Sequence, residues 1–301
     1  MKKKFMRNLD NNDLMNEFLV HALDYEECEK TSEIVTKLVG AEMRLSRLGD
    51  ESTYDSTSFR SPSYKTEAER KKLRKEIFED LISNARLPND DKITLGNGGA
   101  LPNGSSPRKG KHAFLIIGPP ASGKSSIACE IADVKKAIIL DCDYAKRKFP
   151  EYNQDFGASL VHKESDMVVF NAPDKFSFSV FQYCVAAGYN IIIPKIGTDK
   201  IEIEKLRDDL INYGYSVHLI LVSLDRVKAT QRAVSRFVTT NRYVPLSLIF
   251  DQYSNEAILA YYRTKKNVKW TSTGKLSTDT PKGAKPIVVE FENNSPVKIF
   301  K

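Results

Sequence analysis

An apolar run leads into a glycine-rich turn and then a helical pattern in FLIIGPPASGKSSIACEIAD, residues 114–133. The turn has the spacing G-x-x-x-x-G-K-S of a phosphate-binding loop. Its backbone N–H groups can face phosphate oxygens, and the helix N-terminus adds its positive end. The spacing predicts that Lys124 reaches the β- and γ-phosphates of ATP and that Ser125 holds Mg²⁺. The expected nucleotide-binding residues of the loop are Gly118, Pro119, Pro120, Ala121, Ser122, Gly123, Lys124, Ser125 and Ser126.

Two carboxylates follow the next apolar run, in AIILDCDYAKRKFPEY. Asp141 ends that run and Asp143 lies two residues later. Ligands bind outside the carboxyl ends of strands in open α/β sheets, so both carboxylates are expected to face the phosphate site. Asp141 is a candidate Mg²⁺ ligand. Asp143 suits a kinase, in which an aspartate accepts the proton of the attacking hydroxyl. Either aspartate can instead cap the following helix.

Arginines recur in DRVKATQRAVSRFVTTNRYVP. Arg232 and Arg236 are four residues apart and share a helix face, and Arg242 follows near the helix end. Positioned arginines stabilise the charge that phosphoryl transfer spreads over the γ-oxygens. We therefore expect a lid in which Arg236 and Arg242 act in catalysis and Arg232 binds the nucleotide. The alternative is a solvated basic face.

From residue 113 onward, apolar runs alternate with helical segments. This alternation predicts an α/β fold, a doubly wound parallel sheet with helices on both faces, as in P-loop kinases. The expected strands are 113–118, 137–141, 189–194, 216–223 and 286–291. The expected helices are 124–133, 175–187, 200–213, 225–239 and 246–265.

The residues before this alternating region form a different pattern. Apolar spacing predicts two helices within 9–48, and a third helix follows a capping box formed by Thr66 and Glu69. The Gly-, Pro- and Asn-rich stretch 87–111 is expected to be a loop or linker. The predicted organisation is a helical N-terminal extension, 1–60, and a kinase domain, 61–301.

Composition narrows the classes of protein that the chain can belong to. With 301 residues, 41% of them apolar and 28% charged, the chain can bury one sizeable core. No apolar run is long enough to span a membrane. The net charge of +7 suits any phosphate-rich ligand, but the lysines are scattered, so nucleic acid is not the expected partner. The four cysteines form no C-x-x-C pair, which predicts reduced thiols and a cytoplasmic location.

Three blocks together resemble the zeta toxins, P-loop kinases of bacterial toxin–antitoxin systems: GPPASGKSS, DCDYAKRKFP and RFVTTNRYVP. The resemblance covers about residues 65–300. It implies an ATP- and Mg²⁺-dependent kinase that phosphorylates a sugar hydroxyl of a nucleotide sugar, typically UDP-N-acetylglucosamine, whereas related members phosphorylate NAD. It also implies that Asp143 is the general base, that Lys124 and Ser125 bind ATP and Mg²⁺, and that Arg236 and Arg242 clamp the phosphates. A small helical antitoxin is an implied partner.

The acceptor of the phosphoryl group is expected to contact Lys146, His162, Glu164, Lys195 and Thr198. The chain departs from the family pattern at two places: Pro194 and Lys195 stand where an acidic residue and a glycine are usual, and Phe178 stands where a glutamate contacts the aminosugar. A polynucleotide kinase, an NTP-driven switch or motor, and a catalytically inactive binding module remain alternatives. Residues 9–48 are either a fused inhibitor of the ATP site or, as we expect, an extension that packs on the core.

Overall fold

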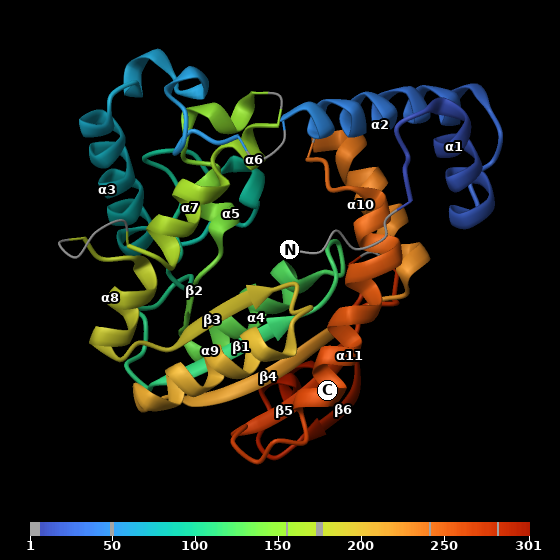
Figure 1. Cartoon of the computed structure of the whole chain (residues 1–301). Helices are drawn as coiled ribbons and strands as arrows, with labels where there is room; N and C mark the ends of the chain where they lie inside the picture. Colours follow the sequence, from blue (N-terminus) through green and yellow to red (C-terminus); the bar gives the residue numbers. More distant parts are fainter. Residues whose placement is uncertain (1–6, 49–50, 155, 173–176, 241, 282) are drawn as a thin grey trace.

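A six-stranded sheet forms the centre of the computed structural model (Figure 1). The structure describes residues 7–48, 51–154, 156–172, 177–240, 242–281 and 283–301. The strand order is β2-β3-β1-β4-β5-β6, with β6 antiparallel to β5 and all other neighbours parallel. The strands are β1 (His112–Ile117), β2 (Ile138–Ile139), β3 (Ile191–Lys195), β4 (Ser216–Ser223), β5 (Ser272–Ser277) and β6 (Ile287–Glu292).

The strands confirm the predicted α/β fold, with two differences at one edge. The apolar runs that form β1 to β4 are buried, as strands covered on both faces should be. The predicted strand 286–291 is β6, but it runs antiparallel at the sheet edge. β5 was not predicted, because STGKLS contains a single large apolar residue, Leu276, and lacks the pattern of a buried strand.

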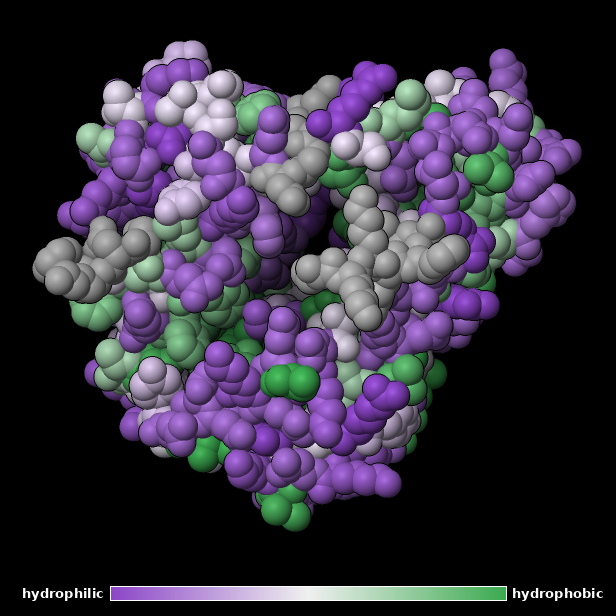
Figure 2. All heavy atoms as spheres, viewed as in Figure 1, coloured by the Kyte–Doolittle hydropathy of each residue, from purple (hydrophilic) through white to green (hydrophobic). Residues whose placement is uncertain are grey.

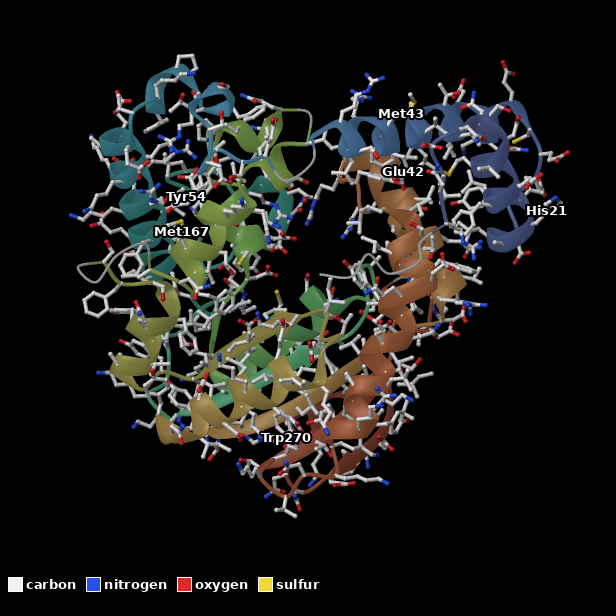
Figure 3. All side chains as sticks on the ribbon, viewed as in Figure 1. His21, Glu42, Met43, Tyr54, Met167 and Trp270 are labelled. Carbon is white, nitrogen blue, oxygen red and sulfur yellow. The ribbon has the colours of Figure 1, made fainter. Side chains whose placement is uncertain are left out.

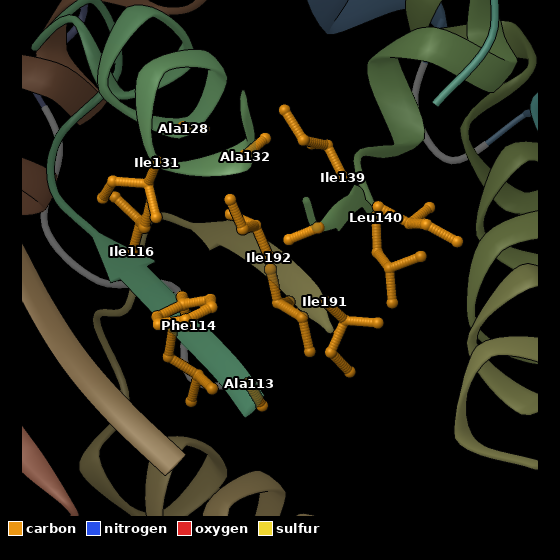
Figure 4. Packing of buried hydrophobic residues seen from close by; sticks show 14 of the residues in the cluster. Ala113, Phe114, Ile116, Ala128, Ile131, Ala132, Ile139, Leu140, Ile191 and Ile192 are labelled. Carbon is orange, nitrogen blue, oxygen red and sulfur yellow. The ribbon is translucent and has the colours of Figure 1, made fainter. Parts of the chain in front are cut away.

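Helices cover both faces of the sheet. α4 (Lys124–Lys135) packs on β1, β2 and β3, whereas α9 (Lys200–Asn212) and α11 (Ser254–Thr264) pack on β4. The connections through α4 and α9 run in opposite directions along the sheet. Because such crossovers are right-handed, the two helices lie on opposite faces. Figure 4 shows Ala128, Ile131 and Ala132 of α4 beside apolar side chains of β1 and β3.

The other helices predicted in the alternating region are also present. α10 (Arg226–Thr240) agrees with the prediction, and α11 is preceded by a π-helical stretch, Leu248–Tyr253. α8 (Val180–Ala187) begins later than predicted because Ser179 and Gln182 form a capping box there. Residues 175–176 of that prediction lie outside the described residues. The short helices α5 (Cys142–Lys146), α6 (Gly157–Leu160) and α7 (His162–Val169) follow β2.

The N-terminal region contains the two predicted helical segments. These are α1 (Asn12–Glu17), continued by a π-helical stretch, and α2 (Glu29–Leu48). They pack on α10 and on residues 246–250 through a second apolar cluster. Figure 1 shows α2 lying across one end of α10. The members of the cluster are Leu9, Met15, Phe18, Leu19, Leu23, Val35, Leu38, Val39, Leu224, Ala229, Ala233, Val234, Leu246, Ile249 and Phe250.

The segment between α2 and β1 packs against the core that surrounds the sheet. α3 (Glu67–Ser83) begins with the predicted capping box of Thr66 and Glu69. The stretch predicted as a loop contains buried Ile93 and Ala100, and the Ala100 carbonyl accepts a hydrogen bond from Ile139 N. The described part of this loop is therefore packed against the core. None of the described helices combines the length and apolar character needed to cross a lipid bilayer.

Candidate active site

The phosphate-binding loop joins the end of β1 to the start of α4. Gly118 passes so close to β4 that a Cβ atom there would lie 2.3 Å from the Val222 carbonyl oxygen. Gly123 has a φ of +85° and precedes α4 without a side-chain cap. Glycine tolerates both conditions, and an uncapped helix start leaves N–H groups available to an anion. The local structure is that of a phosphate cradle.

The Lys124 side chain folds back over this loop. Its Nζ atom donates hydrogen bonds to the carbonyl oxygens of Gly118 (2.7 Å) and Pro119 (2.6 Å). Burial lowers the pKa of the Lys124 ammonium group to about 8, and the charges of Asp141 and Asp143 partly oppose this shift. A lysine held in this way is ready to exchange carbonyl partners for phosphate oxygens.

The two aspartates that follow β2 have different environments. Asp141 Oδ1 accepts a hydrogen bond from Asp143 N at 2.9 Å, so Asp141 caps α5. Burial and the charge of Asp143 raise the pKa of the Asp141 carboxyl. Burial alone would also raise the pKa of Asp143, but Lys146 at 3.0 Å and Arg242 at 2.5 Å outweigh it and hold that pKa well below its usual value. Asp143 is therefore ionised at neutral pH.

The three predicted arginines face the same cleft from α10 and the segment after it. Arg232 donates hydrogen bonds to the carbonyl oxygens of Thr278 (2.9 Å) and Thr280 (3.4 Å). Among the described residues, Arg236 Nε is buried without a hydrogen-bond partner. Burial lowers the pKa of the Arg236 guanidinium, and the neighbouring charge of Arg242 lowers it further. An orphan cationic donor of this kind suits an anionic ligand.

A cleft of about 2060 Å³ joins these groups. Figure 2 shows its opening as a hollow in the middle of one face, surrounded largely by hydrophilic residues. Of the predicted loop residues, the cleft is lined by Pro120, Ala121, Gly123, Lys124, Ser125 and Ser126, whereas Gly118, Pro119 and Ser122 are buried and do not line it.

The residues predicted for Mg²⁺ fit such an ion. The Ser125 side chain and the Asp141 carboxylate both line the cleft. The described residues contain no group of three or more metal-ligating side chains. A serine hydroxyl and a carboxylate are oxygen donors of the kind that Mg²⁺ takes in nucleotide sites, where phosphate and water complete its shell.

The residues predicted to face the acceptor are only partly brought together. Lys146, His162 and Lys195 line the cleft, and Lys195 Nζ lies 4.6 Å from the centroid of the Phe170 ring. Burial, and then the charge of Lys146, lowers the pKa of His162. Thr198 is not among the cleft-lining residues, because the chain turns at Gly197 (φ +74°) towards α9.

Glu164 was predicted to contact the acceptor, and this prediction is wrong. Its side chain is fully buried behind the cleft wall. Its carboxylate pairs with Arg70 (3.1 Å from Nε to Oε1) and with Arg74 (2.7 Å), and it accepts a hydrogen bond from Thr53 at 2.5 Å. On α7, Glu164 lies on the face opposite to His162 and Asp166, which line the cleft, and its bonds to Arg70, Arg74 and Thr53 hold α3 and the segment around Thr53 against that helix.

Two other features of the cleft were not predicted. Asp91 lies near Arg147 (3.2 Å) and Arg242 (3.7 Å), although it belongs to the stretch expected to be a loop or linker. Residues 278–281 and 283–284 line the cleft beside the phosphate-binding loop, where Thr278 Oγ1 donates to the Ser122 carbonyl at 2.7 Å. Neither could be predicted from the spacing of residues in the sequence, because both belong to loops that only the fold brings to the cleft.

A match to a known family identifies the protein family of this chain. The sequence pattern of the family described as zeta toxin matches residues 101–266, more than half of the chain. The chain belongs to the zeta toxin family. The resemblance predicted from the three sequence blocks is thereby confirmed, and family membership supports a phosphotransferase of the kinase type.

Among the solved structures similar to this zeta toxin family member are one with a TM-score above 0.5 and one with a TM-score below 0.5. The chain is similar to a structure from the PezAT chromosomal toxin–antitoxin system of the human pathogen Streptococcus pneumoniae, with 14% identity, a TM-score of 0.54 and coverage of 78% of this chain and 87% of that chain. A structure of the AvrRxo1-ORF1:-ORF2 complex is 13% identical, with a TM-score of 0.45 and coverage of 82% and 74%. At these identities the likeness concerns the fold alone. The search of curated proteins finds no significant match.

Proposed function

We propose that this protein transfers the γ-phosphoryl group of ATP to a hydroxyl of a small, nucleotide-type acceptor. One observation carries the proposal: the phosphate-binding loop with Lys124, the ionised Asp143 and the arginines Arg236 and Arg242 line one cleft. A phosphate loop alone would serve a switch or a motor equally well. A second carboxylate beside it supplies the partner that an attacking hydroxyl needs.

In the proposed reaction, the acceptor oxygen forms a bond to the γ-phosphorus as the bond to the bridging oxygen of ADP breaks. The hydroxyl proton passes to the Asp143 carboxylate. Because Lys146 and Arg242 hold the pKa of Asp143 low, it is a weak base that mainly orients the hydroxyl and takes the proton late. This agrees with the loose transition state of phosphoryl transfer. Lys124, Arg236 and Arg242 stabilise charge on the phosphate oxygens.

Ser125 and Asp141 would hold Mg²⁺, which screens phosphate charge when bound. Asp141 also serves as the cap of α5, so its carboxylate is fixed in place by a backbone N–H group. The capping interpretation and the metal-binding interpretation of Asp141 are therefore compatible, because one carboxylate oxygen caps the helix and the other is left for an ion.

For the acceptor, we propose UDP-N-acetylglucosamine first, from family membership, with NAD as the alternative. The alternative is supported by two departures from the family pattern: Pro194 and Lys195 stand where an acidic residue and a glycine are usual, and Phe178 stands where a glutamate contacts the aminosugar. Lys195, which lines the cleft beside Phe170, suits the pyrophosphate that both acceptors carry. We further propose a helical antitoxin as a partner and, from the four free cysteines, a reducing location such as the cytoplasm.

Incubation with ATP and Mg²⁺ tests this function against three acceptors: UDP-N-acetylglucosamine, NAD and an oligonucleotide with a free 5′-hydroxyl. Mass spectrometry identifies the species that gains a phosphoryl group. We expect transfer to one of the first two. The Asp143→Asn variant should transfer about 10²- to 10⁴-fold more slowly while its affinity for ATP stays within a few-fold of the wild type.

Three outcomes would contradict the proposal. Transfer to the oligonucleotide alone would indicate a polynucleotide kinase. Steady ATP hydrolysis without an acceptor would indicate a switch or motor. Full transfer by Asp143→Asn would remove Asp143 from its role as base.

A further inference from the structure

Arg242 lies in a segment that regular secondary structure does not hold. α10 ends at Thr240, and residues 242–245 form neither helix nor strand. A long side chain on such a segment has many conformations, and fixing it costs conformational entropy. It can assist transfer only if it is kept close to the reacting group. Contacts from elsewhere in the molecule must therefore position it.

The neighbouring residue, Tyr243, makes such contacts with the N-terminal region. Its hydroxyl donates a short hydrogen bond to the Glu42 carboxylate, and its ring meets Phe237 of α10 edge-on with centroids 5.1 Å apart. Burial and the Glu42 charge raise the pKa of the Tyr243 hydroxyl, so it remains a donor. Figure 3 shows Glu42 on the side of α2 near α10, while Met43 lies on the other side.

α2, which carries Glu42, and the residues that precede it are packed against α10. The second apolar cluster joins it to α10, and Gln231 Nε2 of α10 donates to the Leu23 carbonyl at 2.7 Å. Beyond the C-terminal end of α2, Thr53 N donates to the Leu160 carbonyl of α6 at 3.0 Å. The N-terminal region is therefore attached on both sides of the cleft, to α10 and to the wall formed by α6 and α7 (Figure 1).

We propose that Glu42 and Tyr243 are positioning residues for phosphoryl transfer. Through their hydrogen bond, α2 holds the segment after α10 so that Arg242 lies at the cleft, 2.5 Å from Asp143 and 3.7 Å from Asp91. This inference rests on the kinase function proposed above. Under this proposal, the N-terminal extension, residues 1–60, contributes to catalysis by positioning Arg242 and does not inhibit the site.

A double-mutant cycle between Tyr243→Phe and Arg242→Ala tests the inference. The rate of transfer is measured with UDP-N-acetylglucosamine or NAD, whichever the wild type phosphorylates. In the wild-type background, loss of the Tyr243 hydroxyl should lower kcat about tenfold or more with little change in the KM for ATP. In the Arg242→Ala background, the same change should lower kcat less than about twofold, because the arginine that it positions is gone.

Matched variants separate positioning from general destabilisation. Tyr25→Phe removes a hydroxyl from the same helical cluster, where it bonds the Ser235 side chain, and should leave kcat unchanged. Glu42→Gln keeps an acceptor for Tyr243 and should be less impaired than Glu42→Leu, which does not. Should Tyr243→Phe not fold, the two Glu42 variants carry the same cycle.

Equal losses of kcat in both backgrounds would show a merely structural role and overturn the inference. So would a kcat of Tyr243→Phe equal to that of the wild type. A wild-type protein that phosphorylates neither acceptor would instead contradict the proposed function itself, and the positioning role would fall with it.

Discussion

At the scale of single residues, the cleft assigns distinct ionisation states to groups that lie close together. Asp143 is held ionised by two cations, while burial favours the neutral form of Lys124. In the free protein, Lys124 contacts two carbonyl oxygens and is attracted by the charges of Asp141 and Asp143. A bound triphosphate would add several negative charges beside its ammonium group. Binding of ATP should therefore raise the pKa of Lys124 and take up a proton at alkaline pH.

This coupling predicts how ATP affinity changes with pH. With a pKa of about 8 in the free protein, Lys124 is charged below pH 8 and increasingly neutral above it. The Kd for ATP should stay nearly constant from pH 7 to pH 8 and then rise up to about tenfold for each further pH unit. Titrations of the wild type and of Lys124→Arg, whose charge persists, check this. Equal pH dependence in the two proteins would contradict it.

At the scale of elements, a buried charge network holds α3 against α7. Arg70 of α3 is fully buried and pairs with Glu151 at 2.7 Å and with Glu164 of α7. Burial would raise the pKa of Glu164, but the hydrogen bonds and charge of Arg70 lower it overall. Removing one partner of such a network leaves a buried charge without compensation, which costs far more than losing a surface pair.

Glu164→Gln should therefore lower the free energy of unfolding by about 3–5 kcal/mol. The acceptor KM of the protein that remains folded should stay unchanged, because Glu164 does not reach the cleft. Glu79→Gln is the matched control: this exposed glutamate of α3 pairs with Lys75 at 3.7 Å, and its loss should cost less than about 1 kcal/mol. Chemical denaturation measures both. A stable Glu164→Gln protein with a raised acceptor KM would restore the original prediction.

The elements that the sequence predicts well are those whose signal is local. The runs of β1 to β4, the capping box at Thr66 and the phosphate-binding loop depend on near neighbours in the chain, and each is found in place. β5 is not predicted, because its burial comes from its place between β4 and β6, not from apolar residues of its own. Glu164 shows the same limit, since its place in the sequence does not reveal its partners Arg74 and Arg70, which lie 90 and 94 residues earlier.

At the scale of the whole molecule, two apolar clusters come together at the end of β4, where Val222 belongs to the larger cluster and Leu224 to the smaller one. The larger cluster surrounds the sheet, and the smaller one joins the N-terminal helices to α10 and to Leu224, just after β4. The roles of the cleft residues and the division at residue 60 stay predictions. Contacts such as Tyr243 with Glu42 link residues 201 positions apart, and no pattern in one sequence reports them.

Global stability should depend on pH through a histidine pair on the sheet. His112 Nδ1 lies 3.1 Å from His218 Nε2, and His218 Nδ1 bonds Ser272 Oγ at 2.7 Å. Burial, then the charges of His112 and Lys135, lowers the pKa of His218 to about 3. Between pH 6.5 and 3 the unfolded chain therefore binds more protons than the folded one, and stability falls with falling pH.

From pH 7 to pH 5 this one group should cost the wild type about 2 kcal/mol of unfolding free energy, since each pH unit below 6.5 contributes about 1.4 kcal/mol. His218→Gln cannot titrate and should lack this part of the pH dependence, even though the variant starts from a lower stability. Urea unfolding of both proteins at the two pH values measures the difference. Parallel losses in both proteins would mean that His218 is protonated in the folded state, and that the sheet accommodates its charge.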